Sequence, residues 1–176
     1  MSDHIIKLVI AGDGGVGKTT LLNKYVNDMF ESETKLTKGL EFFSKNINFD
    51  DKYYELVIWD LGGQTQFKKL FAKSKWIEGT LGALVLFDLT RFNSLNNIYF
   101  WLDLLDQHGN IPILIIGSKL DMIDGDTKDI DDVVLSVLEV NDNYFDYLKT
   151  SSLTGENVNE SFELLVRKIL SNKNVS

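Results

Sequence analysis

The chain has 176 residues, of which 44% are hydrophobic and 25% charged, so it can form one folded domain and belongs to neither a disordered nor a collagen-like class. Its 18 basic and 26 acidic residues give a net charge of −8, which argues against a general nucleic-acid binder, because such proteins neutralise phosphates with Lys and Arg. The sequence has no cysteine, which excludes disulfides, thiolate metal sites and lipids attached through sulfur.

Strand-like and helix-like segments alternate along the chain. Short apolar stretches typical of strands occur at 4–11, 42–49, 53–59, 81–89, 111–118 and 144–149. Apolar residues at helical spacing occur near 21–26, 95–105, 130–138 and 158–169. The polar residues 50–52 indicate a hairpin turn, which would make one edge strand antiparallel.

This alternation predicts an α/β fold with a single domain over residues 1–176, ending in a short polar tail from about 171. Its sheet would be mostly parallel and six-stranded, with helices on both faces. The longest apolar runs fall well short of the roughly 20 residues of a membrane-spanning helix. We therefore expect a cytoplasmic protein.

A phosphate-binding motif follows the first predicted strand. Residues Gly12 to Thr19 satisfy G-x-x-x-x-G-K-[ST] and lie between a strand and a helix. Glycines let successive backbone N–H groups surround an anion, and a helix N-terminus adds its positive dipole. Lys18 would reach the β- and γ-phosphates, and the Thr19 hydroxyl would bind Mg²⁺. The motif predicts a P-loop nucleoside-triphosphate site, with a glycine-rich turn and a surface lysine as the less favoured interpretation.

A second motif, Ser118-Lys119-Leu120-Asp121, ends the fifth predicted strand. The Asp121 carboxylate can accept hydrogen bonds from N1–H and the exocyclic amine of guanine, a pattern that adenine does not offer. Lys119 would lay its aliphatic stem along the base. Alone, this pattern more often marks solvated loop charges. At a strand end about 100 residues after a P-loop, it predicts guanine recognition.

The third predicted strand ends in Trp59-Asp60-Leu61-Gly62-Gly63-Gln64. Asp60 is expected to hold Mg²⁺, through a water molecule. The Gly63 N–H could sense a γ-phosphate, and Gln64 could orient the attacking water. The alternative is an Asp-Gly turn that only closes the strand.

Together these motifs resemble those of the Ras-superfamily small GTPases, and the resemblance covers essentially the whole chain. Gly12 to Thr20 matches the first motif of that family, and Thr37 matches its switch I threonine. Asp60 to Gln64 matches switch II, Ser118 to Asp121 the base-specificity motif, and Thr150 to Leu153 the last guanine loop.

The resemblance assigns roles to individual residues. It implies catalytic roles for Gln64, Lys18 and Thr37, and metal ligands in Thr19, Thr37 and Asp60. It implies nucleotide contacts from Gly14, Gly15, Val16, Gly17, Lys18, Thr19, Thr20, Phe30, Thr37, Gly63, Ser118, Lys119, Asp121, Ser151, Ser152 and Leu153. Among these, Phe30 would pack against the guanine ring, and the Ser152 backbone N–H would meet guanine O6.

The chain departs from the family pattern at four places. Ser118 replaces an asparagine, Leu153 stands where lysine is common, and Thr34 stands where many members have tyrosine. The switch II sequence at residues 61–64 resembles that of Arf and Gα proteins rather than that of Ras. The fourth strand carries no nucleotide motif and ends like that of Rab-like members. The two arginines, at 91 and 167, lie outside the switches, so an internal arginine finger is not expected.

The resemblance implies a molecular switch that binds guanine nucleotide with Mg²⁺ and hydrolyses GTP to GDP and phosphate. It implies an exchange factor, an activating protein and effectors at the switch surface. A monomer is expected, with no nucleic-acid partner and no lipid anchor on this chain. Phe42, Trp59, Phe67 and Phe71 would form an aromatic partner face or fill the core. Two other functions stay open: a nucleotide-binding scaffold with little hydrolysis, and an ATP-dependent P-loop kinase or transferase.

Overall fold

The computed structural model describes residues 4–31, 38–64 and 75–173. Six strands form one sheet in the order β2-β3-β1-β4-β5-β6. Their bounds are β1 Ile5–Gly12, β2 Leu40–Phe49, β3 Lys52–Leu61, β4 Gly82–Asp88, β5 Ile113–Ser118 and β6 Tyr144–Lys149. Only the β2–β3 pair is antiparallel among these neighbours. The mostly parallel six-stranded sheet is as predicted.

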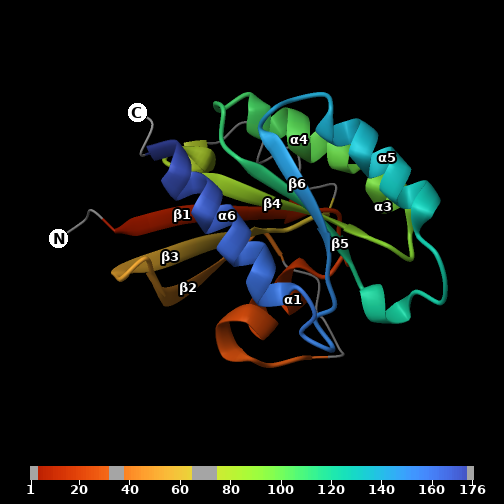
Figure 1. The fold of residues 1–176 in the computed structure, drawn as a ribbon, viewed down its shortest axis with the longest axis horizontal. Helices are drawn as coiled ribbons and strands as arrows, with labels where there is room; N and C mark the ends of the chain where they lie inside the picture. The colour runs from red at the N-terminus through yellow and green to blue at the C-terminus, as the bar shows by residue number, and fades with distance from the viewer. Residues whose placement is uncertain (1–3, 32–37, 65–74, 174–176) are drawn as a thin grey trace.

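Helices cover both faces of this sheet (Figure 1). The described helices are α1 Lys18–Asn27, α3 Phe92–Asn96, α4 Ile98–Asp106, α5 Lys128–Leu138 and α6 Val158–Lys173. Along β1 the side chains alternate between the two layers. Leu8 and Ile10 pack with α1 and α6, whereas Val9 and Ala11 pack with α3, α4 and α5. Both faces of the sheet are therefore buried, which explains the continuous apolar runs of its central strands.

The helix predicted over 95–105 is divided into two. Asn97 is the residue that follows α3 and precedes α4. Its side-chain Nδ2 donates to Asp13 Oδ2 at 2.5 Å. The side chain at the break between the two helices therefore reaches the loop that follows β1.

The carboxyl ends of the parallel strands meet at one edge of the sheet. The register pairs Gly12 at the end of β1 with Leu86 of β4, and Asp88 at the end of β4 with Ser118 at the end of β5. Loops after parallel strands at such an edge form the binding sites of α/β proteins. The motifs that fall within the described residues, at 12–20, 60–64, 118–121 and 150–153, lie at this edge.

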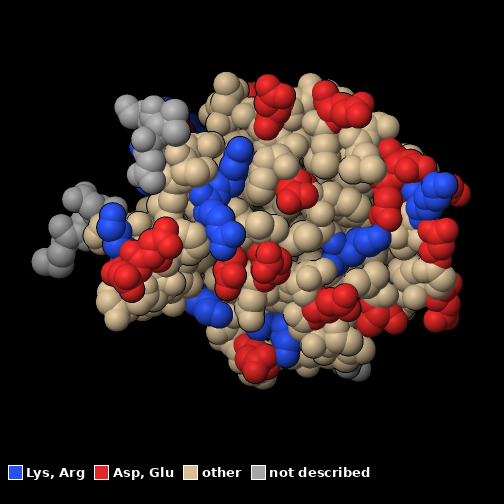
Figure 2. Space-filling model, viewed as in Figure 1, with Lys and Arg blue, Asp and Glu red and all other residues tan. Residues whose placement is uncertain are grey.

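Figure 2 shows acidic side chains gathered where α5 lies, and basic side chains interspersed with acidic ones elsewhere on this face. This distribution accords with the net charge of −8. None of the helices in the described ranges is long and apolar enough to span a lipid bilayer.

Candidate functional site

An open cavity of about 200 Å³ lies at this edge of the sheet. Its walls come from the loop after β1, the start of α1, the chain after α1 and the loops after β5 and β6. The lining residues are Gly15, Gly17, Thr20, Phe30, Glu31, Ser118, Lys119, Asp121, Met122, Ser152 and Leu153. Residues from three separate motifs, together with Phe30 and Glu31 after α1 and Met122 after β5, thus surround one cavity.

The loop between β1 and α1 has the conformation expected of a phosphate-binding loop. Gly15 and Gly17 have φ of 72° and 97°, values that residues with a Cβ rarely adopt. Helix α1 starts without a side-chain cap, so an anion there could accept hydrogen bonds from the N–H groups that a helix leaves unpaired. Lys18 is buried, and its Nζ donates to the carbonyl oxygens of Gly12 at 2.8 Å and Asp13 at 2.9 Å.

Two of the three residues expected to hold Mg²⁺ are in contact. Thr19 Oγ1 donates to Asp60 Oδ2 at 2.5 Å, and Asp60 is fully buried at the end of β3. A hydroxyl and a carboxylate are the oxygen ligands that Mg²⁺ prefers. Within residues 4–31, 38–64 and 75–173, no three His, Asp or Glu side chains form a metal-binding group. This donor set therefore fits a Mg²⁺ ion that takes its remaining ligands from phosphate and water.

The chain just after β3 packs against the phosphate loop. A Cβ placed on Gly63 would lie 2.3 Å from the carbonyl carbon of Asp13 and 2.4 Å from the backbone nitrogen of Gly14. Only glycine fits at this position. Gln64 comes next and is half-buried. The segment expected to orient water therefore begins in contact with the loop expected to bind phosphate.

The serine that replaces the family asparagine also contacts the phosphate loop. Ser118 is buried, and its Oγ lies 2.5 Å from the carbonyl oxygen of Val16 and 2.9 Å from that of Phe87. Because a hydroxyl has one proton, these two carbonyls share it. Ser118 thus joins β5 to the phosphate loop.

The groups predicted to recognise the base lie on the other side of the cavity. Ser151 Oγ, which is buried, lies 2.5 Å from Asp121 Oδ1 and donates to it. Such a bond fixes the direction of the Asp121 carboxylate. Lys119 has a left-handed φ of 62° and lines the same cavity. The apolar side chains of Phe30, Met122 and Leu153 are 42%, 61% and 52% exposed at the cavity, which offers a flat base an apolar surface.

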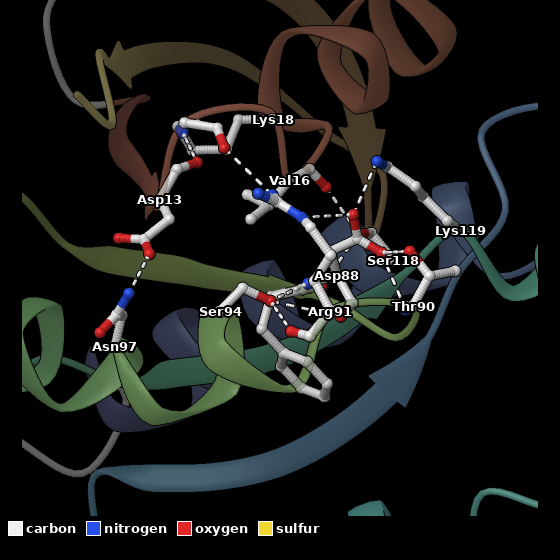
Figure 3. A network of polar contacts seen from close by, with 12 residues as sticks. Asp13, Val16, Lys18, Asp88, Thr90, Arg91, Ser94, Asn97, Ser118 and Lys119 are labelled. Carbon is white, nitrogen blue, oxygen red and sulfur yellow. Dashed lines mark hydrogen bonds and ion pairs between the residues drawn. The ribbon is translucent and has the colours of Figure 1, made fainter.

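Sequence reasoning missed a network at the end of β4, shown in Figure 3. The buried Asp88 carboxylate accepts hydrogen bonds from Thr90 and Arg91 and forms an ion pair with Lys119. Burial alone would raise the pKa of Asp88, but the bonds from Lys119, Thr90 and Arg91 outweigh it and hold this pKa below its ordinary value. The strand end that carries no nucleotide motif therefore contacts Lys119, the lysine predicted to pack along the base.

Arg91 was also missed. Its Nε donates to Asp88 Oδ2 at 3.0 Å, and its Nη2 donates to the Gly14 carbonyl oxygen at 3.0 Å. Met122 and Glu31 complete the cavity lining that sequence reasoning did not find. Acidic residues follow many strands, and no spacing rule links position 91 to position 14. The Arg91 contact is therefore not predictable from a sequence pattern.

Several predicted residues lie outside the described ranges, namely Thr34, Thr37, Phe67 and Phe71. Of the predicted aromatic face, Phe42 is 62% exposed and makes an edge-to-face contact with Trp59, with ring centroids 4.9 Å apart. Phe42 therefore does not fill the core. Trp59 is half-buried, and Lys7 Nζ lies 3.6 Å from the centroid of its ring.

The comparisons with known proteins agree with this geometry. The model of the Ras family matches residues 7–171. The chain is 32% identical over 169 residues to the GTP-binding protein ypt3 of Schizosaccharomyces pombe, covering 95% of this chain and 77% of the relative. It is 34% identical over 172 residues to the Ras-related protein RABA5c of Arabidopsis thaliana, covering 97% and 78%. It is 29% identical over 175 residues to the Ras-related protein Rab7 of Cenchrus ciliaris, covering 96% and 84%. The chain belongs to the Ras family of small GTPases.

Proposed function

We propose specific roles for individual residues of this small GTPase in guanine recognition, phosphate binding and GTP hydrolysis. The observation that carries the proposal is the meeting of three features at one sheet edge. These are a phosphate loop with left-handed glycines, a Thr19–Asp60 contact beside it and a cavity lined by Asp121. Each feature matches one part of a nucleoside triphosphate: its phosphates, its metal ion and its base.

The base half of the cavity selects guanine. Asp121 accepts the N1–H and the exocyclic amine of guanine, and its bond from Ser151 holds the carboxylate in that direction. Phe30 and the stem of Lys119 pack against the ring, with Leu153 at its edge. The Ser152 N–H meets guanine O6. Adenine would leave the carboxylate without its two donors, so this half rejects ATP.

The phosphate half binds the triphosphate through main-chain N–H groups of residues 14–20 and the Lys18 ammonium. Thr19 and Asp60 are the described residues that would hold Mg²⁺, with Thr37 as the expected third ligand. When bound, this ion neutralises negative charge on the β- and γ-phosphate oxygens. The buried Asp60 carboxylate keeps Thr19 Oγ1 oriented by accepting a hydrogen bond from it.

Hydrolysis is an in-line attack of water on the γ-phosphorus. A P–O bond forms to the water oxygen, the bond to the bridging oxygen breaks, and GDP leaves with the electron pair, while a proton of the water passes to a phosphate oxygen or to solvent. Gln64 orients this water, because an amide is not basic enough near neutral pH to act as a base. Lys18 stabilises the charge that develops on the phosphate oxygens. Gly63 offers its N–H to the γ-phosphate, so loss of that phosphate would release the segment that begins there.

Partner proteins would bind the surface next to the nucleotide and distinguish the GTP-bound from the GDP-bound form there. Phe42 is exposed on β2, and large aromatic side chains that are exposed in a free protein often anchor interfaces. Exchange factors, activating proteins and effectors would bind here, to a monomer in the cytoplasm. The relatives compared carry Ypt and Rab names, which supports a Rab-type switch.

The test is turnover by the purified protein with Mg²⁺. We expect release of phosphate from GTP and not from ATP, and bound GDP or GTP when the nucleotide that co-purifies is identified by chromatography. Gln64→Leu should bind GTP normally and slow hydrolysis about 10²-fold, because the water loses its orienting amide. Gln107→Leu, at an exposed position after α4, is the matched control. Full hydrolysis by Gln64→Leu would contradict the role of Gln64.

A further inference from the structure

We propose that Arg91 is a positioning residue that orients the phosphate loop, and that Asp88 links it to the base-recognition lysine. The inference rests on the proposed binding of guanine nucleotide and adds a contact that no motif predicts. It starts from the two hydrogen bonds of Arg91, one to the Asp88 carboxylate and one to the Gly14 carbonyl (Figure 3).

The Gly14 carbonyl sets the direction of a neighbouring N–H group. In a planar trans peptide, the C=O of one residue and the N–H of the next point in opposite directions. When Arg91 Nη2 holds the Gly14 oxygen at 3.0 Å, the Gly15 N–H must point away from the guanidinium. Gly15 lines the nucleotide cavity, and its left-handed φ of 72° is one that a glycine adopts without strain.

The same arrangement recurs two residues further along the loop. Ser118 Oγ holds the Val16 carbonyl at 2.5 Å, so the Gly17 N–H points the opposite way. Gly17 also lines the cavity and also has a left-handed φ. Alternate carbonyls of the loop are therefore held from outside by side chains, and the N–H groups of the two lining glycines are oriented as a result. Arg91 binds the Gly14 carbonyl, and Ser118 binds the Val16 carbonyl.

Arg91 is itself held by a buried anion. The Asp88 side chain is fully buried, and its Oδ2 accepts from Arg91 Nε at 3.0 Å and pairs with Lys119 Nζ at 2.7 Å. The other oxygen, Oδ1, accepts from the backbone N–H of Thr90 at 2.9 Å and from its hydroxyl at 2.6 Å. One carboxylate thus fixes a cation on the base side and a cation on the phosphate side of the cavity.

The role requires a guanidinium. Its planar fork presents Nε to Asp88 and Nη2 to Gly14 at the same time, whereas an ammonium at position 91 is a single point of charge on a flexible stem. Charge neutralisation alone would not need arginine, because Lys119 already pairs with Asp88. Replacement by lysine therefore separates positioning from simple charge balance.

The test compares the affinities of GDP, GMP and IDP for the wild type and for Arg91→Gln, Arg91→Lys and Arg167→Gln. Arg167 is the other arginine of the chain and is exposed on α6, so its variant is the matched control. Arg91→Gln should lower the ratio of GDP to GMP affinity about 10-fold, because an oriented N–H no longer serves the phosphate tail. The ratio of GDP to IDP affinity should stay unchanged, because IDP lacks only the exocyclic amine. Arg91→Lys should resemble Arg91→Gln.

Asp88→Asn is the second variant. It keeps the shape of the side chain and removes the charge that holds both cations, so we expect it to lower the GDP to GMP ratio. It should also weaken GDP and IDP to the same extent, because Lys119 packs against the ring that both bases share. Loss of folding would weaken all three ligands equally and leave both ratios unchanged. Equal weakening of GDP and GMP by an Arg91→Gln variant that unfolds at the same denaturant concentration as the wild type would overturn the positioning role. Wild-type behaviour of Arg91→Lys would also overturn it. A wild type that binds no GDP would instead overturn the proposed function.

Discussion

The phosphate half and the base half of the nucleotide site are built in different ways. The phosphate half is one continuous segment, and its shape comes from glycine backbone angles at Gly15 and Gly17. The base half is assembled from loops after α1, β5 and β6, which contribute Phe30, Asp121 and Leu153. In the proposed function, backbone N–H groups and the Lys18 ammonium bind the phosphates, whereas most contacts to the base come from side chains.

This difference accounts for two of the four departures from the family pattern, at Ser118 and Leu153. The segment Gly12–Thr19 keeps every residue of its motif, because a Cβ at a left-handed glycine would strain the backbone. The base half carries Ser118 and Leu153 instead of the family residues, and each can substitute for the original contact. Ser118 contacts the Val16 carbonyl through its hydroxyl, and Leu153 offers apolar surface at the cavity. Side-chain contacts tolerate replacement better than backbone conformation does.

The largest effect is expected in the phosphate half, from Lys18→Ala. Lys18 is buried and is the cation that holds two loop carbonyls, so its loss removes the charge for the phosphates and loosens the loop. We expect GDP and GTP to bind roughly 10³-fold more weakly, as measured by titration with a fluorescent nucleotide. Lys52→Ala, at an exposed position in the β2–β3 hairpin, should bind normally. Unchanged nucleotide affinity in Lys18→Ala would contradict the proposal that Lys18 in the phosphate half makes the largest contribution to binding.

Asp121→Asn should change the base half while sparing the phosphate half. An asparagine offers one acceptor and one donor, which suits xanthine, where a carbonyl replaces the exocyclic amine of guanine. We expect affinity for GDP to fall about 10²-fold and affinity for XDP to rise. Asp124→Asn, an exposed neighbour, is the matched control. An unchanged preference for GDP would show that another group recognises the base.

The same difference between local and assembled parts decides which features of the structure can be predicted from the sequence. Apolar periodicity predicts the sheet well, because residues 144–149 form β6 and residues 42–49 lie within β2. The phosphate loop is predictable because its chemistry is local. The contacts of Asp88 with Lys119 and of Arg91 with Gly14 are not, because they depend on which strands are neighbours and on how far long side chains reach. The break in the helix at Asn97 likewise accompanies a contact with the distant Asp13.

Ser118→Ala tests whether the serine joins the two halves. The variant leaves the Val16 carbonyl without its buried donor and frees the peptide that orients the Gly17 N–H. We expect GDP to dissociate about 10-fold faster, because an unpaired buried acceptor costs on the order of 1–3 kcal/mol. Ser136→Ala removes an exposed hydroxyl that bonds to the Asp132 carbonyl within α5, and it is the control. Equal dissociation rates in Ser118→Ala and wild type would make Ser118 a passive replacement for asparagine.

The smallest effect is a pH dependence that originates between the two halves, at Asp88. Burial opposes ionisation of this carboxyl, but the bonds from Lys119, Thr90 and Arg91 prevail, so its pKa lies below the ordinary value in the folded state. A lowered folded-state pKa contributes stability that is present above the ordinary pKa of about 3.8 and is lost as pH falls through the folded-state value.

In denaturant titrations, Asp88→Asn should therefore be less stable than the wild type near neutral pH, and the difference should shrink as the pH falls below about 4. Asp124→Asn, exposed after β5, should show no such convergence. A difference between Asp88→Asn and wild type that stays constant down to low pH would mean that the shape of the side chain at position 88, and not its charge, joins the base lysine to the phosphate loop. The charge link between the two halves would then fail, although each half could still bind its own part of the nucleotide.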